Sequence, residues 1–206
     1  RLILFILFLL VVFPLRATAD FEEEKISLAK KAFKDGFYTI ARENLERFLK
    51  DYPQTKKSQE AHSLIGQCLY YEGKLHKALY EFETALNTSV EKKLKAEASY
   101  WIGEVHFKGG DFKSAVVSYQ KLIDEYPDFP YLASAYYSMG WSYYQDGQFE
   151  EAIRAFNELI QRFPKDNLVE ESKFKLAQSL YNLKRYQETE ETFTSFIAEY
   201  PSSEKL

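Results

Sequence analysis

Apolar residues recur at helical spacing in two consecutive runs near the middle of the chain, on either side of Gly147. A spacing of three and four residues places them on one face of a helix. Gly147 separates the runs, because glycine readily takes the left-handed conformation that ends a helix. Pro164 follows the second run and cannot continue it. The runs comprise Tyr136, Met139, Gly140, Tyr143 and Tyr144, then Phe149, Ala152, Ile153, Phe156, Leu159, Ile160 and Phe163. The pattern predicts two helices joined by a tight turn.

The same pattern recurs every 37 residues along the chain. Three features share this period: the turn glycine, a small residue of the second helix, and a proline after an aromatic residue. Chance does not explain three independent features with one period. These positions are Gly36, Gly73, Gly110 and Gly147; Ala41, Ala78, Ala115 and Ala152; and Pro53, Pro127, Pro164 and Pro201, with Val90 as the one failure. We predict five helix-turn-helix copies at about 21–57, 58–94, 95–131, 132–168 and 169–206. The expected fold is an all-α solenoid of ten helices in a right-handed superhelix.

A second series of small residues lies inside the first helices, at Ala29, Gly66, Gly103 and Gly140. A mid-helix glycine costs about 1 kcal/mol relative to alanine, so another interaction must offset it. We expect a close helix–helix approach there, with Ala152 and its equivalents facing the same crossing. The fifth copy departs from the pattern, since Ala177 and Lys184 replace its two glycines and Thr189 its small residue.

The first residues are typical of a secretory leader. A short apolar run follows Arg1 and ends before the small residues Ala17 and Ala19. The run is too short to span a bilayer, and its pattern favours a signal peptide over 1–19, cleaved after Ala19. An uncleaved anchor is the alternative. We also expect that the sequence begins within the signal and that further residues follow Leu206.

Composition and charge exclude several classes of function. The chain has 27 Lys+Arg and 31 Asp+Glu, so it offers no basic patch for nucleic acid or anionic lipid. Cys68 is the single cysteine, which excludes an internal disulfide and favours a small buried side chain. The three histidines have no metal-ligand spacing, and His106 is expected to be buried. We find no nucleophile motif, and therefore expect no enzyme activity, no cofactor and no metal.

The series Gly140, Tyr143, Gly147, Phe149, Ala152, Phe156 and Pro164 resembles the tetratricopeptide repeat (TPR). The usual TPR period is about 34 residues, and the longer joints here are similar to those of exported TPR proteins of Gram-negative envelopes. Two such groups are the Tol-Pal-associated division coordinator and the TPR lipoprotein of the β-barrel assembly machine. The chain lacks the acylated cysteine of the lipoprotein and a coiled coil ahead of the repeats. The resemblance covers residues 21–206.

This resemblance implies a partner-binding groove lined by the first helices. Some TPR grooves hold the C-terminus of a peptide with a clamp of Lys and Asn side chains. The corresponding positions of this chain hold Tyr, Trp, Gln and Glu, so that clamp is absent. Aromatic residues dominate interface hot spots, and we expect Tyr137 and Trp141 to anchor a partner. The column of Tyr70, Phe107, Tyr144 and Tyr181 lines the groove or packs between repeats. The candidate groove residues are Tyr100, Tyr137, Trp141, Phe174, Tyr70, Phe107, Tyr144 and Tyr181.

The sequence therefore predicts a periplasmic scaffold that is not a lipoprotein, has no integral span in its mature chain, and binds segments of envelope proteins and no nucleic acid. Two alternatives are the targeting arm of an envelope enzyme with a downstream catalytic domain, and a module that binds peptidoglycan. Phe193, Phe196 and Ile197 belong to the last predicted helix. If no further helix covers them, we expect self-association through this uncapped repeat.

Overall fold

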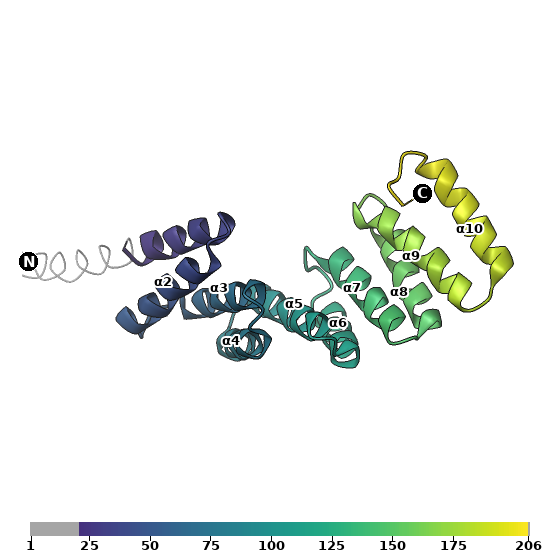
Figure 1. Cartoon of the computed structure of the whole chain (residues 1–206). Coiled ribbons are helices and arrows are strands. Elements are labelled where there is room, and N and C mark those ends of the chain that lie inside the picture. The colour runs from purple at the N-terminus through teal and green to yellow at the C-terminus, as the bar shows by residue number, and fades with distance from the viewer. Residues whose placement is uncertain (1–20, 206) are drawn as a thin grey trace, which may run out of the picture. The chain divides into compact units, whose positions relative to one another are not determined.

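Residues 21–205, which the computed structural model describes, form ten helices and no strand (Figure 1). The predicted leader over 1–19 lies outside the described residues. The chain divides into two compact units, Arg1–Ala98 and Ser99–Leu206. The prediction of an all-α helical-repeat solenoid is confirmed, whereas the handedness of the superhelix stays a prediction.

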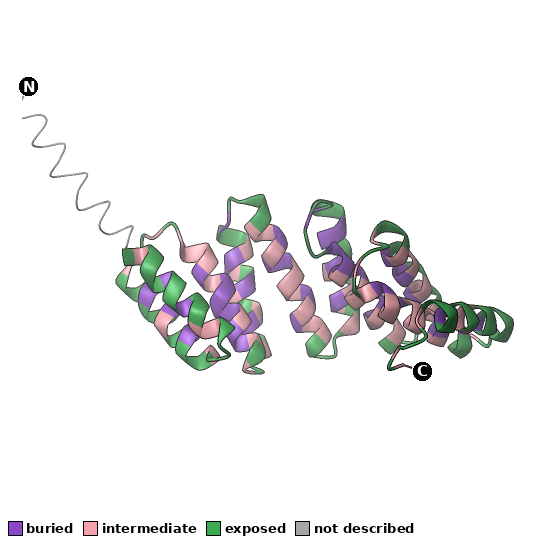
Figure 2. Cartoon of the chain, turned by 90° about the horizontal axis from the view of Figure 1, so that it is seen from above, coloured by how far each residue is buried: buried purple, intermediate pink, exposed green. Residues whose placement is uncertain are grey.

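The first unit contains the helical residues 21–34. They are followed by α2 (Tyr38–Asp51), α3 (Ser58–Tyr71), α4 (Leu75–Thr88) and the start of α5 (Lys92–Lys108). The second unit holds the rest of α5, then α6 (Phe112–Glu125), α7 (Leu132–Gln145), α8 (Phe149–Arg162), α9 (Leu168–Asn182) and α10 (Tyr186–Glu199). Buried and exposed residues alternate along each helix, as they do when one face is covered (Figure 2).

The predicted turn glycines end first helices in the left-handed conformation. Gly36, Gly73, Gly110 and Gly147 have φ angles of 80°, 76°, 78° and 76°. At the end of α7, the Gly147 N–H donates to the Tyr144 carbonyl at 3.1 Å, and the Gln148 N–H donates to the Tyr143 carbonyl at 2.9 Å. These two bonds satisfy carbonyls that the end of a helix otherwise leaves without a partner.

Lys184 takes this role in the last repeat, with φ at 61°. A residue with a Cβ pays about 1–2 kcal/mol in this region, whereas glycine does not. We expect Lys184→Gly to raise the free energy of unfolding by about 1 kcal/mol, measured by urea denaturation. Gly147→Lys is the matched control and should lower it by a similar amount. Equal stability of both variants and the wild type would contradict the prediction.

The mid-helix glycines lie directly against aromatic rings of the following second helices. A Cβ added at Gly66, Gly103 or Gly140 would lie 2.7, 2.6 or 2.8 Å from the ring of Phe82, Tyr119 or Phe156. The close approach is therefore confirmed, and the group that makes it is an aromatic ring of the second helix, a contact that we did not predict. Ala152, which we expected at this crossing, is fully buried in α8. In the first repeat, the smaller Leu45 stands at the ring position and Ala29 at the glycine position, and both are fully buried.

The segment after the last helix folds back onto the first helix of its own repeat. The Ser203 hydroxyl donates to Glu170 at 2.6 Å, and Lys205 forms an ion pair with Glu171 at 2.7 Å. The first repeat has the same closing contacts, in which Thr55 donates to Glu22 at 2.7 Å and Lys57 pairs with Glu23. The first and the last repeat are therefore closed by the same two kinds of contact, a hydroxyl to a glutamate and a lysine to a glutamate.

The exposure expected for the last helix is wrong for one of its three residues. Phe196 is 1% exposed, with its ring centroid 5.7 Å from that of Phe174. Phe193 is half-buried and also lies 5.7 Å from Phe174, whereas Ile197 is 49% exposed. The two rings are covered from within the repeat, because Phe174 on α9 packs against both of them.

Candidate functional site

Two of the rings expected to bind a partner in the second unit form a cluster where α7 faces α9. Trp141 and Tyr144 are stacked, with ring centroids 5.1 Å apart and an interplanar angle of 13°. Lys175 of α9 places its Nζ 3.9 Å from the centroid of the Trp141 ring and 5.9 Å from that of Tyr144. A lysine over an indole face forms a cation–π contact, which holds the ring in place. We call Trp141, Tyr144 and Lys175 the α7–α9 cluster.

Lys175 is the residue of this cluster that the sequence analysis missed. Burial lowers the pKa of its ammonium, while Glu171 at 4.0 Å opposes that change. Its Nζ also donates to the side-chain oxygen of Gln178 at 3.2 Å. Glu171, Lys175 and Gln178 follow one another at helical spacing, and this is the signal that could have placed them on one face of α9.

Tyr137, the other expected anchor, is half-buried beside the core. Its ring centroid lies 6.0 Å from that of Phe156, which is fully buried. Burial raises the pKa of Tyr137 to about 12, and the charge of Glu171 adds to the effect. Phe174 is likewise half-buried, against Phe193 and Phe196. Both side chains therefore support the packing of their own repeats.

The column of Phe107, Tyr144 and Tyr181 contacts the second helix of each repeat across the turn. Each ring meets, edge to face, the aromatic residue five positions later, and these pairs are Phe107–Phe112, Tyr144–Phe149 and Tyr181–Tyr186, at 5.9, 5.4 and 5.8 Å. The Tyr144 hydroxyl also accepts a bond from Asn182 at 3.1 Å. Tyr181 is 60% exposed. In the first unit, Tyr70 is half-buried and meets Tyr71 edge to face at 5.4 Å.

Tyr100 and Glu104 occupy the corresponding face of α5 in the second unit. The Tyr100 ring lies 6.0 Å from Phe129 and 6.2 Å from Tyr131. Glu104 accepts hydrogen bonds from the buried Tyr119 hydroxyl at 2.7 Å and from Ser138 at 3.0 Å. Burial, with Glu104 adding to it, raises the pKa of Tyr119 well above its ordinary value. These two bonds make Glu104 a structural acceptor between α6 and α7.

Cys68 and two of the three histidines lie in structural settings. Cys68 is buried, and burial raises the pKa of its thiol to about 12. His62 Nδ1 lies 2.6 Å from Glu81. His106, which we expected to be buried, is only half-buried. Its Nδ1 lies 3.6 Å from the carboxylate of Asp111, which is in the exposed turn before α6. Among residues 21–205, no group of three His, Cys, Asp or Glu side chains could hold a metal ion.

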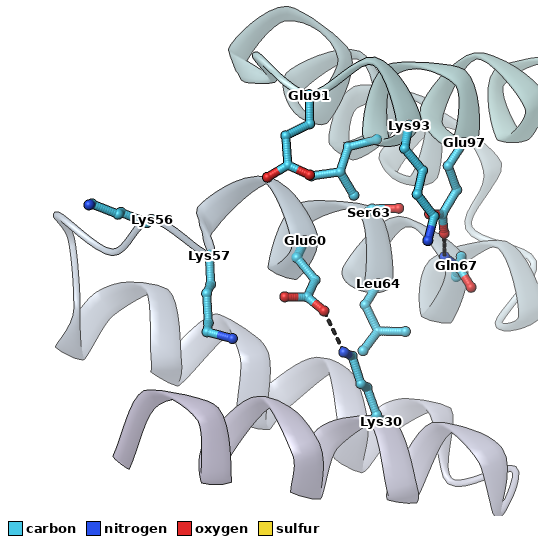
Figure 3. A pocket seen from close by; sticks show the side chains of 11 residues that line it. Lys30, Lys56, Lys57, Glu60, Ser63, Leu64, Gln67, Glu91, Lys93 and Glu97 are labelled. Carbon is cyan, nitrogen blue, oxygen red and sulfur yellow. Dashed lines mark hydrogen bonds and ion pairs between the residues drawn. The ribbon is translucent and has the colours of Figure 1, made fainter. Parts of the chain in front are cut away.

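A polar pocket lies in the first unit (Figure 3). Its volume is about 500 Å³. The α3 residues Glu60, Ser63, Leu64 and Gln67 line it, between Lys30 of the first helix and residues 91–97 at the start of α5. Lys30 pairs with Glu60, and the Gln67 amide donates to Glu97 at 3.2 Å. Burial raises the pKa of Glu97, with Gln67 and Lys93 opposing the effect.

Family models match most of the chain. Tetratricopeptide-repeat models match residues 26–92 and 94–165, and a model described as an outer membrane lipoprotein matches residues 131–206. A comparison with curated proteins gave no match. No helix in the described part of the chain is long and apolar enough to cross a membrane.

Solved structures share the fold. A tetratricopeptide-repeat protein from Parabacteroides merdae has 21% identity and a TM-score of 0.74, over 88% of this chain and 68% of that one. MamA (residues 41 to the end) from Desulfovibrio magneticus has 20% identity and a TM-score of 0.73, over 89% and 97%. A putative kinesin light chain from Podosopora anserina has 15% identity and a TM-score of 0.70, over 88% and 96%.

The repeated helix pairs, their turn glycines and these matches together define a helical-repeat protein with the fold of protein-interaction scaffolds. The chain is a tetratricopeptide-repeat protein, and it resembles outer-membrane TPR lipoproteins in its last two repeats.

Proposed function

We propose that this protein is a non-catalytic scaffold of the bacterial cell envelope that binds a segment of a partner protein on its first helices. Export to the periplasm, with cleavage after Ala19, is part of the proposal. It is supported by the leader pattern of the first residues and by the match of residues 131–206 to an outer membrane lipoprotein model.

The observation that carries the proposal is the α7–α9 cluster. Trp141 and Tyr144 are both half-buried, whereas other residues of the same helix, α7, are buried in the core. Their stacking and the Lys175 contact hold the rings before any partner arrives. Pre-ordered aromatic rings provide contact area at a small loss of side-chain entropy, as interface hot spots do. Tyr181 of α9 is exposed and occupies the position of Tyr144 in the following repeat.

The test removes two rings that are not among the buried core residues, since Trp141 is half-buried and Tyr181 is exposed. Tyr137 is unsuitable, because its ring lies beside Phe156. We expect the double variant Trp141→Ala, Tyr181→Ala to lose about 2–4 kcal/mol of binding, roughly 30- to 1000-fold in affinity. Partners are first identified by crosslinking in the native envelope, and binding to purified partner is then measured by calorimetry. Tyr80→Ala is the control, since Tyr80 is 66% exposed on the second helix α4.

The melting temperature separates binding from folding. A double variant that melts like the wild type and no longer binds supports the proposal. Unchanged affinity would contradict it, and a large fall in melting temperature would mean that these rings are core residues.

A further inference from the structure

Carboxylates recur near the start of the first helices, at Glu23, Glu60, Glu97 and Glu171. Three of them have a lysine partner: Glu23 pairs with Lys57, Glu60 with Lys30, and Glu171 with Lys205. Glu97 differs, because it accepts a hydrogen bond from the neutral Gln67 amide at 3.2 Å. No lysine or arginine between residues 21 and 205 lies within salt-bridge distance of Glu97. Glu97 is therefore the member of this series that lacks a cation.

Glu97 is also partly withdrawn from water. Burial is the main influence on its carboxyl group and disfavours the charged form. The charges of Lys93 and Lys30 favour the charged form of Glu97, and the charge of Glu60 disfavours it. None of these three side chains bonds directly to the Glu97 carboxylate. A desolvated carboxylate with one amide donor keeps unused acceptor sites. It would gain more than a solvated carboxylate from a cation that bonds to it.

The pocket beside Glu97 includes a position that carries an aromatic ring in later repeats. The repeats of the second unit carry Tyr100, Tyr137 and Phe174 at one position, and the first unit has Ser63 at the equivalent position of α3. The space left there is about 500 Å³. Ser63 is 5% exposed, and its hydroxyl has no hydrogen-bond partner. In Figure 3 this hydroxyl points towards the side of the pocket that Lys93 and Glu97 form.

We infer that this pocket is a second binding site, which takes a cationic side chain, arginine above all, from a partner protein. A guanidinium has five donors in a planar fork, so it can bond Glu97 and reach the Ser63 hydroxyl. Leu64 and Leu94 line the same space and would contact the aliphatic part of the side chain. Of the four lysines that line the pocket, Lys30 and Lys57 are paired with Glu60 and Glu23, and the charges of Lys56 and Lys93 are balanced by Glu91 and Glu97. An entering arginine therefore competes for Glu97 with Lys93, which acts on that carboxylate only at a distance. The site is separate from the α7–α9 cluster and extends the proposed function.

The test is selection of a random peptide library on the whole chain and on Glu97→Gln. Glutamine keeps the shape and the Gln67 contact but removes the charge. We expect wild-type protein to select peptides with a recurring arginine or lysine, and Glu97→Gln to lose them. Glu83→Gln is the matched control, because Glu83 is exposed on α4. Replacing the selected arginine by citrulline, a neutral isostere, should weaken binding at least about tenfold.

A second variant tests the space itself. Ser63→Tyr supplies the ring that Tyr100 and Tyr137 provide in later repeats, and we expect it to abolish binding of the selected peptide. Melting temperatures of both variants at or near the wild-type value show that the loss is not unfolding. The Trp141→Ala, Tyr181→Ala variant should still bind the arginine peptide, so failure of one site is distinguishable from failure of the other. Selected peptides without a basic residue, or the same peptides on Glu97→Gln, would overturn the inference.

Discussion

Replacing Phe196 with alanine is expected to lower the free energy of unfolding by about 3–5 kcal/mol, the range for truncating a buried phenylalanine. Phe196 is 1% exposed, and its ring lies 5.7 Å from Phe174 and 5.2 Å from Tyr200. Truncation would leave a cavity between α9, α10 and the residues after α10. Urea denaturation of the variant and the wild type measures the effect.

Ile197→Ala is the matched control, because the neighbouring Ile197 is 49% exposed. It should change the free energy of unfolding by no more than about 0.5 kcal/mol. Similar small effects for both substitutions would mean that the last repeat is loosely packed in solution. In that case Phe196 would be available for the self-association that the sequence analysis expected.

Replacing Gly140 with valine is expected to destabilise the protein by about 2–3 kcal/mol, near the upper end for overpacked sites. The new Cβ would lie 2.8 Å from the Phe156 ring, which is itself fully buried and has little room to move. Valine has a somewhat higher helix propensity than glycine, which offsets a small part of this cost. Thermal and urea denaturation measure the loss.

The repeats supply a sharper control for the Gly140 contact. The first repeat has Ala29 and Leu45 at the positions of Gly140 and Phe156, and both are fully buried. We therefore expect Gly140→Ala and Phe156→Leu to be less costly together than the sum of their separate costs. A double-mutant cycle measures this coupling. Strict additivity would contradict a direct contact between Gly140 and Phe156.

The sequence was sufficient where one residue type has one physical use. The period of 37 residues gave the helix pairs, and Gly147 and its equivalents gave the turns. The sequence was insufficient to predict contacts between residues that occupy different positions within the repeat. Lys175 contacts Trp141 of the preceding repeat, and alignment of the repeats compares Lys175 with Ser138 instead. The edge-to-face pairs across the turns, such as Tyr144 with Phe149, were missed for a related reason. Their two rings belong to different helices, and helical spacing was read within each helix separately.

The final helix shows why exposure is hard to predict from a repeat pattern. Its apolar residues were assigned to the face that a following repeat would cover. The structure covers Phe196 with Phe174 and Tyr200 of its own repeat. Which of two neighbouring apolar residues is buried depends on the helix rotation, and a shift of one residue turns a helix by about 100°.

The closing contacts of the first and last repeats have a consequence for how such an array changes in evolution. Thr55 with Glu22, and Ser203 with Glu170, each join the end of a repeat to its own beginning. The polar groups at these joints are thus satisfied without help from an adjacent copy. A gene segment encoding one such unit could be duplicated or deleted by unequal recombination without leaving those groups unbonded. Arrays of this kind can therefore vary in length by whole units while each joint stays intact.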